Sequence, residues 1–343
     1  MTAPIIARVD RARIGGRWVT DAVVELSGTG MRLVPPDEAP ERVLRHIEGS
    51  LMPPITDAHV HLGLAEAAVP APSALGRVLD LGWVPDALPG LSAAARGAHH
   101  GLDVRVAGPF HAAVGGYPSM REWAPPGAVA ELADASDVAR SIRAQSAAGA
   151  SVIKVAMNAE DGPVPDDALL AEIVAEAHAV GLPLVAHVQG AGQAERALLA
   201  GVDVLAHAPW TERLSDDLIA AAAASQTWVS TLAMHSRDGD DIAFARATDN
   251  LARFAAHGGA VAYGTDLGNG ISRFDLDPNE LAALRQAGIE GTALVDALLS
   301  EWLLPPGVTV TWLPADVIDD ESAIEHLHRA GPLPVARFHM EDE

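Results

Sequence analysis

The fold class is decided by residues 151–188, SVIKVAMNAEDGPVPDDALLAEIVAEAHAVGLPLVAHV. This stretch begins and ends with an apolar, β-branched run that is typical of a buried strand. Between the two runs, the apolar residues of 165–181 keep to one helical face, Pro165 and two aspartates open the helix, and Gly181 closes it. A strand, a helix and a second strand in this order predict a unit of parallel sheet.

The same alternation continues on both sides of this unit. Strand-like runs separated by helix-sized segments are ITDAHVHL (55–62), GRVLDLGWV (76–84), DVRVAG (103–108), SVIKVAM (151–157), PLVAHV (183–188), VDVLAHA (202–208), TWVSTLAM (227–234) and AVAYGTD (260–266). Eight such runs predict a (β/α)8 barrel. A doubly wound open sheet is disfavoured, because no phosphate-binding glycine loop follows the first run.

The two ends of the chain have a different texture. Residues before about 50 are short strand-like runs broken by Gly15-Gly16 and Gly28-Thr29-Gly30, and they predict a small β-sheet unit. After about residue 304 the chain returns to short strands that can complete this unit, and the last dozen residues are expected to be a loosely held end.

Composition excludes several classes of protein. The chain has 343 residues, 46 acidic against 23 basic side chains, a formal net charge of −23, no cysteine and 49% apolar residues. This composition excludes disordered and collagen-like chains, and no apolar run approaches the roughly 20 residues of a membrane-spanning helix. The acidity argues against nucleic-acid and membrane-surface partners, and the start lacks the pattern of a signal peptide. We therefore expect a soluble, cytoplasmic protein without disulfides or thiol chemistry.

Lys154 is the single lysine of the chain, because the other 22 of the 23 basic residues are arginines. It lies inside the strand-like run SVIKVAM, where an isolated ammonium group would carry a large desolvation cost. A lysine retained at such a position is expected to be paired, neutralised or chemically modified.

Several side chains that can bind metal recur near the ends of predicted strands. His59 and His61 are separated by one residue, so they project from the same face of a strand. His187, His207 and Asp266 each lie near the carboxyl end of a different run, and Lys154 lies in the run before that of His187. Because barrel enzymes place their active-site groups at this end of the strands, six groups are expected to meet at one barrel mouth.

A lysine at such a site has a specific chemical option. Carboxylation by CO2 converts its amine into a carbamate whose two oxygens can bridge two divalent ions. A pair of ions about 3.5–4 Å apart binds a bridging hydroxide at neutral pH and polarises a carbonyl or phosphoryl oxygen. Asp266 could then take a proton from the hydroxide and transfer it to the leaving group.

The motifs DAHVH, SVIKVAM, LVAHVQG, VLAHAPW and YGTDLG, in this order and spacing, resemble the amidohydrolase superfamily over roughly residues 50–270. The phrases EIVAEAHAVGLPLVAHV and ALLAGVDVLAHA resemble its prolidase and imidazolonepropionase-like branch. The resemblance implies a distorted TIM (β/α)8 barrel over residues 53–303 and a small composite β-sandwich from residues 1–52 and 304–343.

The resemblance also implies a role for each ligand. His59, His61 and Asp266 would hold the more buried ion, His187 and His207 the more exposed one, and Lys154 would bridge them as N6-carboxylysine. Asp266 would be the catalytic acid and base. Zinc is the expected metal, although manganese, iron or nickel would fit the same ligands.

Residues after predicted strands are candidates for substrate contacts. These are His111, Tyr117, Arg121, Trp210 and His235, with Trp123 and Asn269 on the same predicted face. Arg121 and Arg237 could clamp a substrate carboxylate. Asp57 also faces inward by strand parity, but we expect it to organise neighbouring strands rather than to bind metal.

The sequence thus predicts a binuclear metal-dependent hydrolase that cleaves an amide, peptide or cyclic amide C–N bond of a small molecule with a metal-bridging hydroxide. One alternative is a lactonase, esterase or phosphotriesterase on the same site. A second is a single-metal deaminase or imidazolone-type hydrolase, against which Lys154 argues, and a third is a catalytically silent barrel. The substrate and any homo-oligomer are left open by the sequence.

Overall fold

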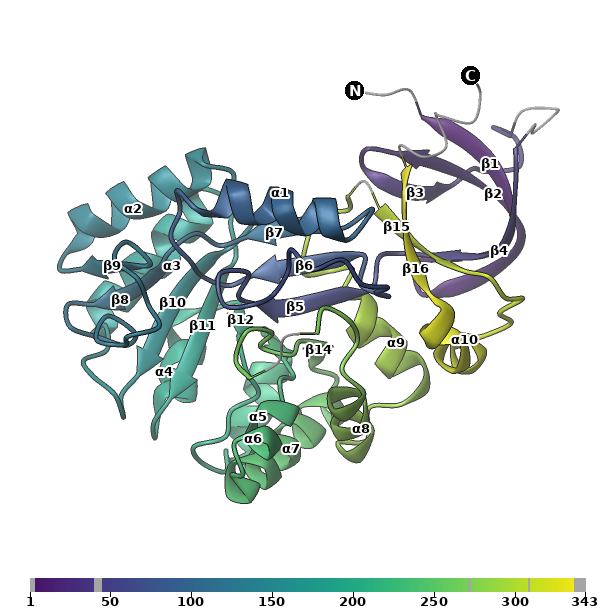
Figure 1. Cartoon of the computed structure of the whole chain (residues 1–343). Coiled ribbons are helices and arrows are strands. Elements are labelled where there is room, and N and C mark those ends of the chain that lie inside the picture. The colour runs from purple at the N-terminus through teal and green to yellow at the C-terminus, as the bar shows by residue number, and fades with distance from the viewer. Residues whose placement is uncertain (1–3, 40–44, 271–272, 308, 336–343) are drawn as a thin grey trace.

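The computed structural model describes residues 4–39, 45–270, 273–307 and 309–335 (Figure 1). One six-stranded sheet contains both ends of the described chain, and two further sheets of seven and three strands contain its middle. In Figure 1 the strands of the six-stranded sheet lie together at one end of the molecule, beside the helix-covered remainder.

The six-stranded sheet combines N-terminal and C-terminal strands in the order β16-β15-β4-β1-β2-β3. Its strands are β1 (Ile5–Ile14), β2 (Arg17–Ser27), β3 (Gly30–Leu33), β4 (His46–Met52), β15 (Thr309–Leu313) and β16 (Gly331–Pro334). β15 pairs antiparallel with β4, so that Trp312 lies opposite Leu51. The predicted return of the chain to the N-terminal sheet is thus observed. The two-layer sandwich and its domain boundaries stay predictions.

The two remaining sheets consist of parallel strands. The three-stranded sheet has β5 (Thr56–Val60), β6 (Arg77–Asp80) and β7 (Asp103–Val106), and the seven-stranded sheet has β8 (Phe110–Ala113), β9 (Val129–Leu132), β10 (Ile153–Asn158), β11 (Leu184–Gln189), β12 (Val204–Leu205), β13 (Thr227–Val229) and β14 (Ala260–Ala262). All of their ladders are parallel. Each of the eight strand-like runs contains one strand, which confirms the predicted parallel α/β organisation.

Backbone hydrogen bonds join the two parallel sheets at both sides. The Ser151 amide donates to the Val106 carbonyl at 2.8 Å, which links β10 to β7. On the other side, the Ala58 amide donates to Tyr263 O at 2.9 Å and the His61 amide to Leu267 O at 2.7 Å. The first parallel strand, β5, is therefore a neighbour of the last, β14.

Helices follow most of the parallel strands. They are α1 (Leu88–Ala98), α2 (Ala135–Ala147), α3 (Asp167–Ala179), α4 (Gln193–Ala200), α5 (Asp216–Ala223), α6 (Ala233–Arg237), α7 (Asp241–Ala256), α8 (Pro278–Gln286), α9 (Gly291–Leu299) and α10 (Asp320–His326), with a 3-10 turn at Leu327–Arg329. In the described part of the chain, no helix has both the length and the apolar character that crossing a membrane would require.

α3 shows why these segments are helical. The Asp166 side chain accepts a hydrogen bond from the Leu169 amide at 2.8 Å, which satisfies one free donor of the first turn. Ile173 and Ala177 lie four residues apart on the buried face. Gly181, at φ +74°, ends the helix in a conformation that most other residues avoid. The predicted helix over 165–181 is confirmed over Asp167–Ala179.

The parallel strands are buried on both faces. On β11, Leu184 and Ala186 belong to the main core cluster that includes apolar residues of the helices, whereas Val185 belongs to a second cluster. Strand residues of that second cluster include Leu79, Val204 and Ala262. Since successive strand residues alternate between faces, this second cluster lies on the face away from the helices. Lys154 and His187 share this face with Val152 and Val185 by the same alternation.

Candidate metal centre

Six predicted ligands surround one cavity at the carboxyl ends of the parallel strands. His59 lies in β5 and His61 just after it, Lys154 in β10 and His187 in β11, while His207 and Asp266 follow β12 and β14. All six line a cavity of about 270 Å³, here called the strand-end cavity. The geometry thus brings together every residue of the predicted ligand set, and their binding of metal stays a prediction.

Three of these side chains converge on a single point. His59 Nε2 lies 3.2 Å from His61 Nε2 and 3.2 Å from Asp266 Oδ1, and His61 Nε2 lies 3.4 Å from the same Oδ1. One potential ligand atom from each residue lies within 4.8 Å of the other two. Two imidazoles and a carboxylate at such distances can share one ion.

The protonation of the two imidazoles follows from their other contacts. His59 Nδ1 lies 2.8 Å from the Ala206 carbonyl oxygen and His61 Nδ1 lies 3.2 Å from the Gly82 carbonyl oxygen. A carbonyl only accepts hydrogen bonds, so in the neutral rings each Nδ1 carries the proton. Burial lowers the pKa of His59 well below its ordinary value, which favours the neutral form. When both rings carry their proton on Nδ1 alone, the two Nε2 lone pairs point toward each other and toward the Asp266 carboxylate.

His187 and His207 form the second part of the site. Their ring centroids are 4.9 Å apart, and that of His207 lies 4.6 Å from that of His59. His207 Nδ1 is 2.9 Å from Thr231 Oγ1, which leaves Nε2 free for another ligand. Burial lowers the pKa of His187 to about 4, so this imidazole is neutral near pH 7.

Lys154 is only 1% exposed, and its side chain faces this cavity. No residue in the described ranges forms a hydrogen bond or ion pair with its ammonium group. Burial lowers the pKa of Lys154 to about 7, although the carboxylates of Asp266 and Asp80 favour the charged form. A substantial fraction of the Lys154 amine is therefore unprotonated near neutral pH, and the unprotonated amine is the form that reacts with CO2.

Asp57 ties the first ligand strand to the last. Its carboxylate accepts hydrogen bonds from the amides of His59 and Thr265, both at 3.1 Å, and from Thr265 Oγ1 at 2.6 Å. Asp57 does not line the cavity, in agreement with the expectation that it organises strands. Gly264 permits the close approach, because a Cβ there would lie 2.3 Å from Val229 Cγ1 and 3.2 Å from the backbone nitrogen of His59.

One predicted ligand and one residue that bonds a ligand adopt an uncommon backbone conformation. Asp266 has φ +57° and Thr231, the partner of His207, has φ +44°. Such conformations in residues other than glycine persist where the surroundings enforce them, and they concentrate at functional sites. Near Thr231, the fully buried Glu280 accepts hydrogen bonds from the amides of Leu232 and Ala233 at 3.0 and 2.7 Å.

The candidate substrate contacts divide into two groups. Tyr117, Trp210 and His235 line the strand-end cavity, as do Trp123 and Asn269. Tyr117 stacks on His187 with centroids 5.3 Å apart, and Asn269 donates to Asp266 Oδ2 at 3.0 Å.

His111, Arg121 and Arg237 are not brought to the cavity. His111 is fully buried between the Lys154 carbonyl oxygen, 3.0 Å from Nδ1, and Ser141 Oγ, 2.9 Å from Nε2. Arg121 forms an ion pair with Asp161. Arg237 bonds Asp277 at 3.3 Å and the Thr265 carbonyl at 3.2 Å, so the proposed carboxylate clamp is not supported.

Sequence reasoning missed six lining residues, namely Phe110, Ala156, Gln189, Met234, Asp238 and Asp240. Gln189 was detectable, since it follows His187 by two residues on the same strand. The acidic run around 238–241 also follows a predicted strand, but a surface helix start has the same composition. Asp240 does serve such a start, because its side chain accepts from the Ala243 amide at 2.9 Å.

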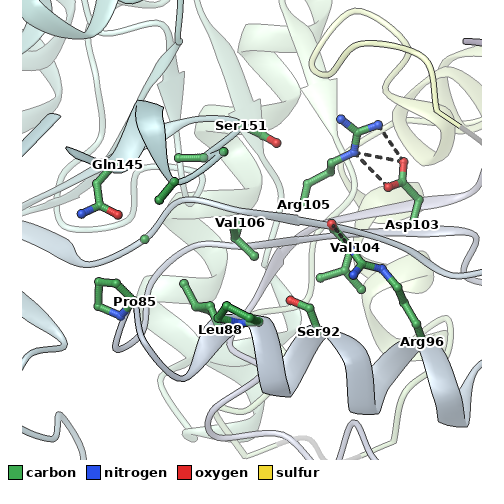
Figure 2. Close-up of a pocket in the computed structure, with 15 residues that line it drawn as sticks. Pro85, Leu88, Ser92, Arg96, Asp103, Val104, Arg105, Val106, Gln145 and Ser151 are labelled. Atoms are coloured by element: carbon green, nitrogen blue, oxygen red, sulfur yellow. Dashed lines mark hydrogen bonds and ion pairs between the residues drawn. The ribbon is translucent and has the colours of Figure 1, made fainter. Parts of the chain in front are cut away.

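A second, larger cavity of about 430 Å³ lies between α1, β7 and α2 and is here called the α1–α2 groove (Figure 2). Ser92 and Arg96 reach it from α1, and Gln145 from α2 (Figure 2). Arg105 forms two-pronged hydrogen bonds with Asp103 at 3.0 to 3.1 Å. The groove has no cluster of histidine and carboxylate ligands among its described residues.

No family model matches the chain, and no curated protein matches it in sequence. Solved structures do match. A Xaa-Pro dipeptidase with bound methionine superposes with a TM-score of 0.68 and 16% identity, over 94% of this chain and 97% of that one. An amidohydrolase gives 0.66 and 18% over 95% of each chain, and phenylurea hydrolase B gives 0.69 and 14% over 97% and 96%. The resemblance inferred from the motifs is thus confirmed at the level of the fold: this chain folds as amidohydrolase and dipeptidase structures do, along nearly its whole length.

Proposed function

We propose that this chain is a metal-dependent hydrolase of the amidohydrolase superfamily that cleaves a C–N bond of a small amide, peptide or cyclic amide. The fold supports this proposal, because several solved structures that share it are named as hydrolases of dipeptides or phenylureas. We also infer that the two parallel sheets, joined at both sides by backbone hydrogen bonds, form one distorted (β/α)8 barrel.

The observation that carries the proposal is the meeting of His59 Nε2, His61 Nε2 and Asp266 Oδ1 at 3.2 to 3.4 Å. With both Nδ1 atoms donating to backbone carbonyls, three electron-rich atoms face one another. When both rings are neutral, this arrangement is repulsive unless a cation lies between them. The donor set thus fits a divalent ion, and the second-layer carbonyls orient the imidazoles as they do in metal proteins.

A second ion would be held by His187 and His207, with carboxylated Lys154 between the two positions. The buried ammonium of Lys154, which has no partner among the described residues, supports this assignment, since a carbamate would be paired with the ions. Divalent ions at these positions, zinc being the expected metal, would polarise a scissile carbonyl and lower the pKa of a water molecule.

The side chains supply the remaining steps. Asp266 lies at the convergence point, and we assign it the transfer of a proton from the attacking water to the leaving nitrogen. Asn269 holds the other carboxylate oxygen of Asp266 at 3.0 Å and so fixes its orientation. Tyr117, Trp123 and Trp210 would surround the substrate and displace water from the reacting carbonyl.

Metal stoichiometry tests the proposal directly. Protein purified with bicarbonate and without chelators should contain about two ions per chain by elemental mass spectrometry. The Lys154→Met variant should lose at least one of them. A single ion in the native protein would favour a one-metal hydrolase, and none would contradict the proposal.

A further inference from the structure

Charged groups are distributed unevenly around the strand-end cavity. Among its described lining residues, Lys154 is the only lysine or arginine, whereas Asp238, Asp240 and Asp266 are acidic. The arginines that could have reached it, Arg121 and Arg237, are bound to other carboxylates. A substrate carboxylate would therefore meet no arginine in the described lining.

Aromatic side chains make up much of the remaining lining. Trp123 contacts Phe110 and Tyr117 edge-on, with centroids 5.9 and 6.1 Å apart. Trp210 lies 5.1 Å from the ring of His235 and 5.7 Å from that of His187. Rigid aromatic surfaces of this kind suit a flat, apolar group of a ligand.

His235 faces the cavity without a partner of its own. It is 5% exposed, and none of the described residues forms a hydrogen bond with its ring. Its ring nitrogens are not among the fully buried atoms that lack a partner, so they remain open to the cavity, where a ligand can bond them. Burial lowers the pKa of His235 to about 4, which leaves a neutral imidazole with one donor and one acceptor.

Asp238 and Asp240 lie beside His235, at the junction of α6 and α7. Both are exposed and line the cavity, and neither forms an ion pair within the described ranges. Two unpaired carboxylates at the entrance make it attractive to cations and repulsive to anions.

We propose that the site selects amides that carry a flat aromatic group and an ammonium group, accepts neutral analogues less well, and rejects those with a carboxylate. This inference rests on the hydrolase function proposed above. In it, Asp238 and Asp240 determine the charge preference, and His235 provides a hydrogen bond to the bound ligand.

A series of three matched ligands tests the charge preference. 4-(Aminomethyl)benzamide, 4-methylbenzamide and 4-carbamoylbenzoate differ mainly in charge, and binding to zinc-loaded protein can be followed by tryptophan fluorescence. At low salt the ammonium compound should bind about tenfold more tightly than the carboxylate, with the neutral compound between them. Because exposed charges are screened, the ratio should shrink in about 0.5 M salt.

The Asp238→Asn, Asp240→Asn double variant should reduce this ratio to less than about threefold. Asparagine retains the helix-capping ability of Asp240. The control is Glu172→Gln with Asp217→Asn, which removes two exposed acidic groups of α3 and α5 and should leave the ratio unchanged.

Two outcomes would overturn the inference, namely equal or tighter binding of the carboxylate and no binding of any of the three compounds. Ammonia release, measured in the same samples, tests the hydrolase separately. The expected binding order without any ammonia would support the charge preference and count against the hydrolase. Release of ammonia chiefly from 4-carbamoylbenzoate would support the hydrolase and count against the charge preference.

Discussion

The α1–α2 groove and the strand-end cavity differ in how their polar groups are compensated. In the larger α1–α2 groove, Arg105 is paired with Asp103, and Arg96 donates to the Val104 carbonyl at 3.0 Å. In the smaller strand-end cavity, the ammonium of Lys154 has no partner among the residues that the structure describes, and two imidazoles face a carboxylate. Uncompensated buried groups, rather than volume, therefore indicate which of the two cavities binds a ligand.

The largest expected effect comes from the ligands themselves. Lys154→Met and Asp266→Asn should each lower kcat/KM by at least about a thousandfold, because they remove an ion ligand or the proton-transfer group. Steady-state kinetics on a hydrolysed amide measures the loss, and circular dichroism checks that the fold is kept. Turnover near that of the native protein in either variant would show that catalysis does not depend on the strand-end cavity.

Removing metal should affect stability as well as activity. An ion that binds only the folded chain raises the free energy of unfolding by about 2.7 kcal/mol at a hundredfold excess over its Kd. Adding zinc to chelator-treated protein should therefore raise Tm by a few degrees, as followed by calorimetry. A His59→Ala, His61→Ala variant should show a much smaller rise, and an equal rise in both proteins would place the ion elsewhere.

Removing the hydrogen bond between Thr265 and Asp57 should have an intermediate effect on metal affinity. Thr265→Val removes the 2.6 Å hydrogen bond to Asp57 but leaves every ligand in place. Metal affinity should fall about tenfold, as is typical when a group that orients ligands is lost. Thr265→Ser restores the hydroxyl and should recover most of the affinity in a competition titration with a chromophoric chelator. Failure of that recovery would assign the loss to packing instead.

His235→Phe should have a smaller effect, because it keeps the ring but removes the hydrogen bond to the ligand. We expect about a fivefold weaker binding of 4-(aminomethyl)benzamide, which is the usual size of one neutral hydrogen bond. The same fluorescence titration measures it. His235→Gln retains a donor and an acceptor and serves as the comparison, and tighter binding by the phenylalanine variant would remove His235 from ligand recognition.

The smallest effect should follow changes in the α1–α2 groove. Ser92→Ala and Gln145→Ala alter side chains that line the groove and not the strand-end cavity. Neither should change kcat/KM by more than about twofold, as is usual away from a reacting centre. A tenfold loss in either variant would show that the groove contributes to activity.

The sequence predicted the ligand positions well for a physical reason. In a parallel α/β chain every strand presents its carboxyl end to the same side, so residues near those ends converge wherever the strands are recognised correctly. All eight strand-like runs contained a strand, so the ligands near strand ends met, while Lys154, the second residue of β10, reaches the same cavity from the start of its strand.

The side-chain direction of His111 was harder to predict. It lies on β8, a four-residue strand that the sequence did not reveal, and it pairs with Val155 rather than with Lys154. Because side chains alternate along a strand, this difference of one residue turns the imidazole away from the cavity. Arg121 was misplaced for another reason, since its partner Asp161 comes from a distant loop that local sequence cannot bring near it.

Lys154 lies buried at the wall of the strand-end cavity, so a label on its amine would report on the candidate metal centre. Since no other lysine exists, reductive methylation with ¹³C-formaldehyde can label only this side chain and the α-amino group at the start of the chain. Because a methylated amine no longer reacts with CO2, the Lys154 resonance reports only the chains whose amine was free when the reagent was added, and the Lys154→Met variant distinguishes it from the resonance of the α-amino group. A weaker Lys154 resonance when bicarbonate and metal are added before the methylation would measure the fraction of chains whose amine is already carboxylated.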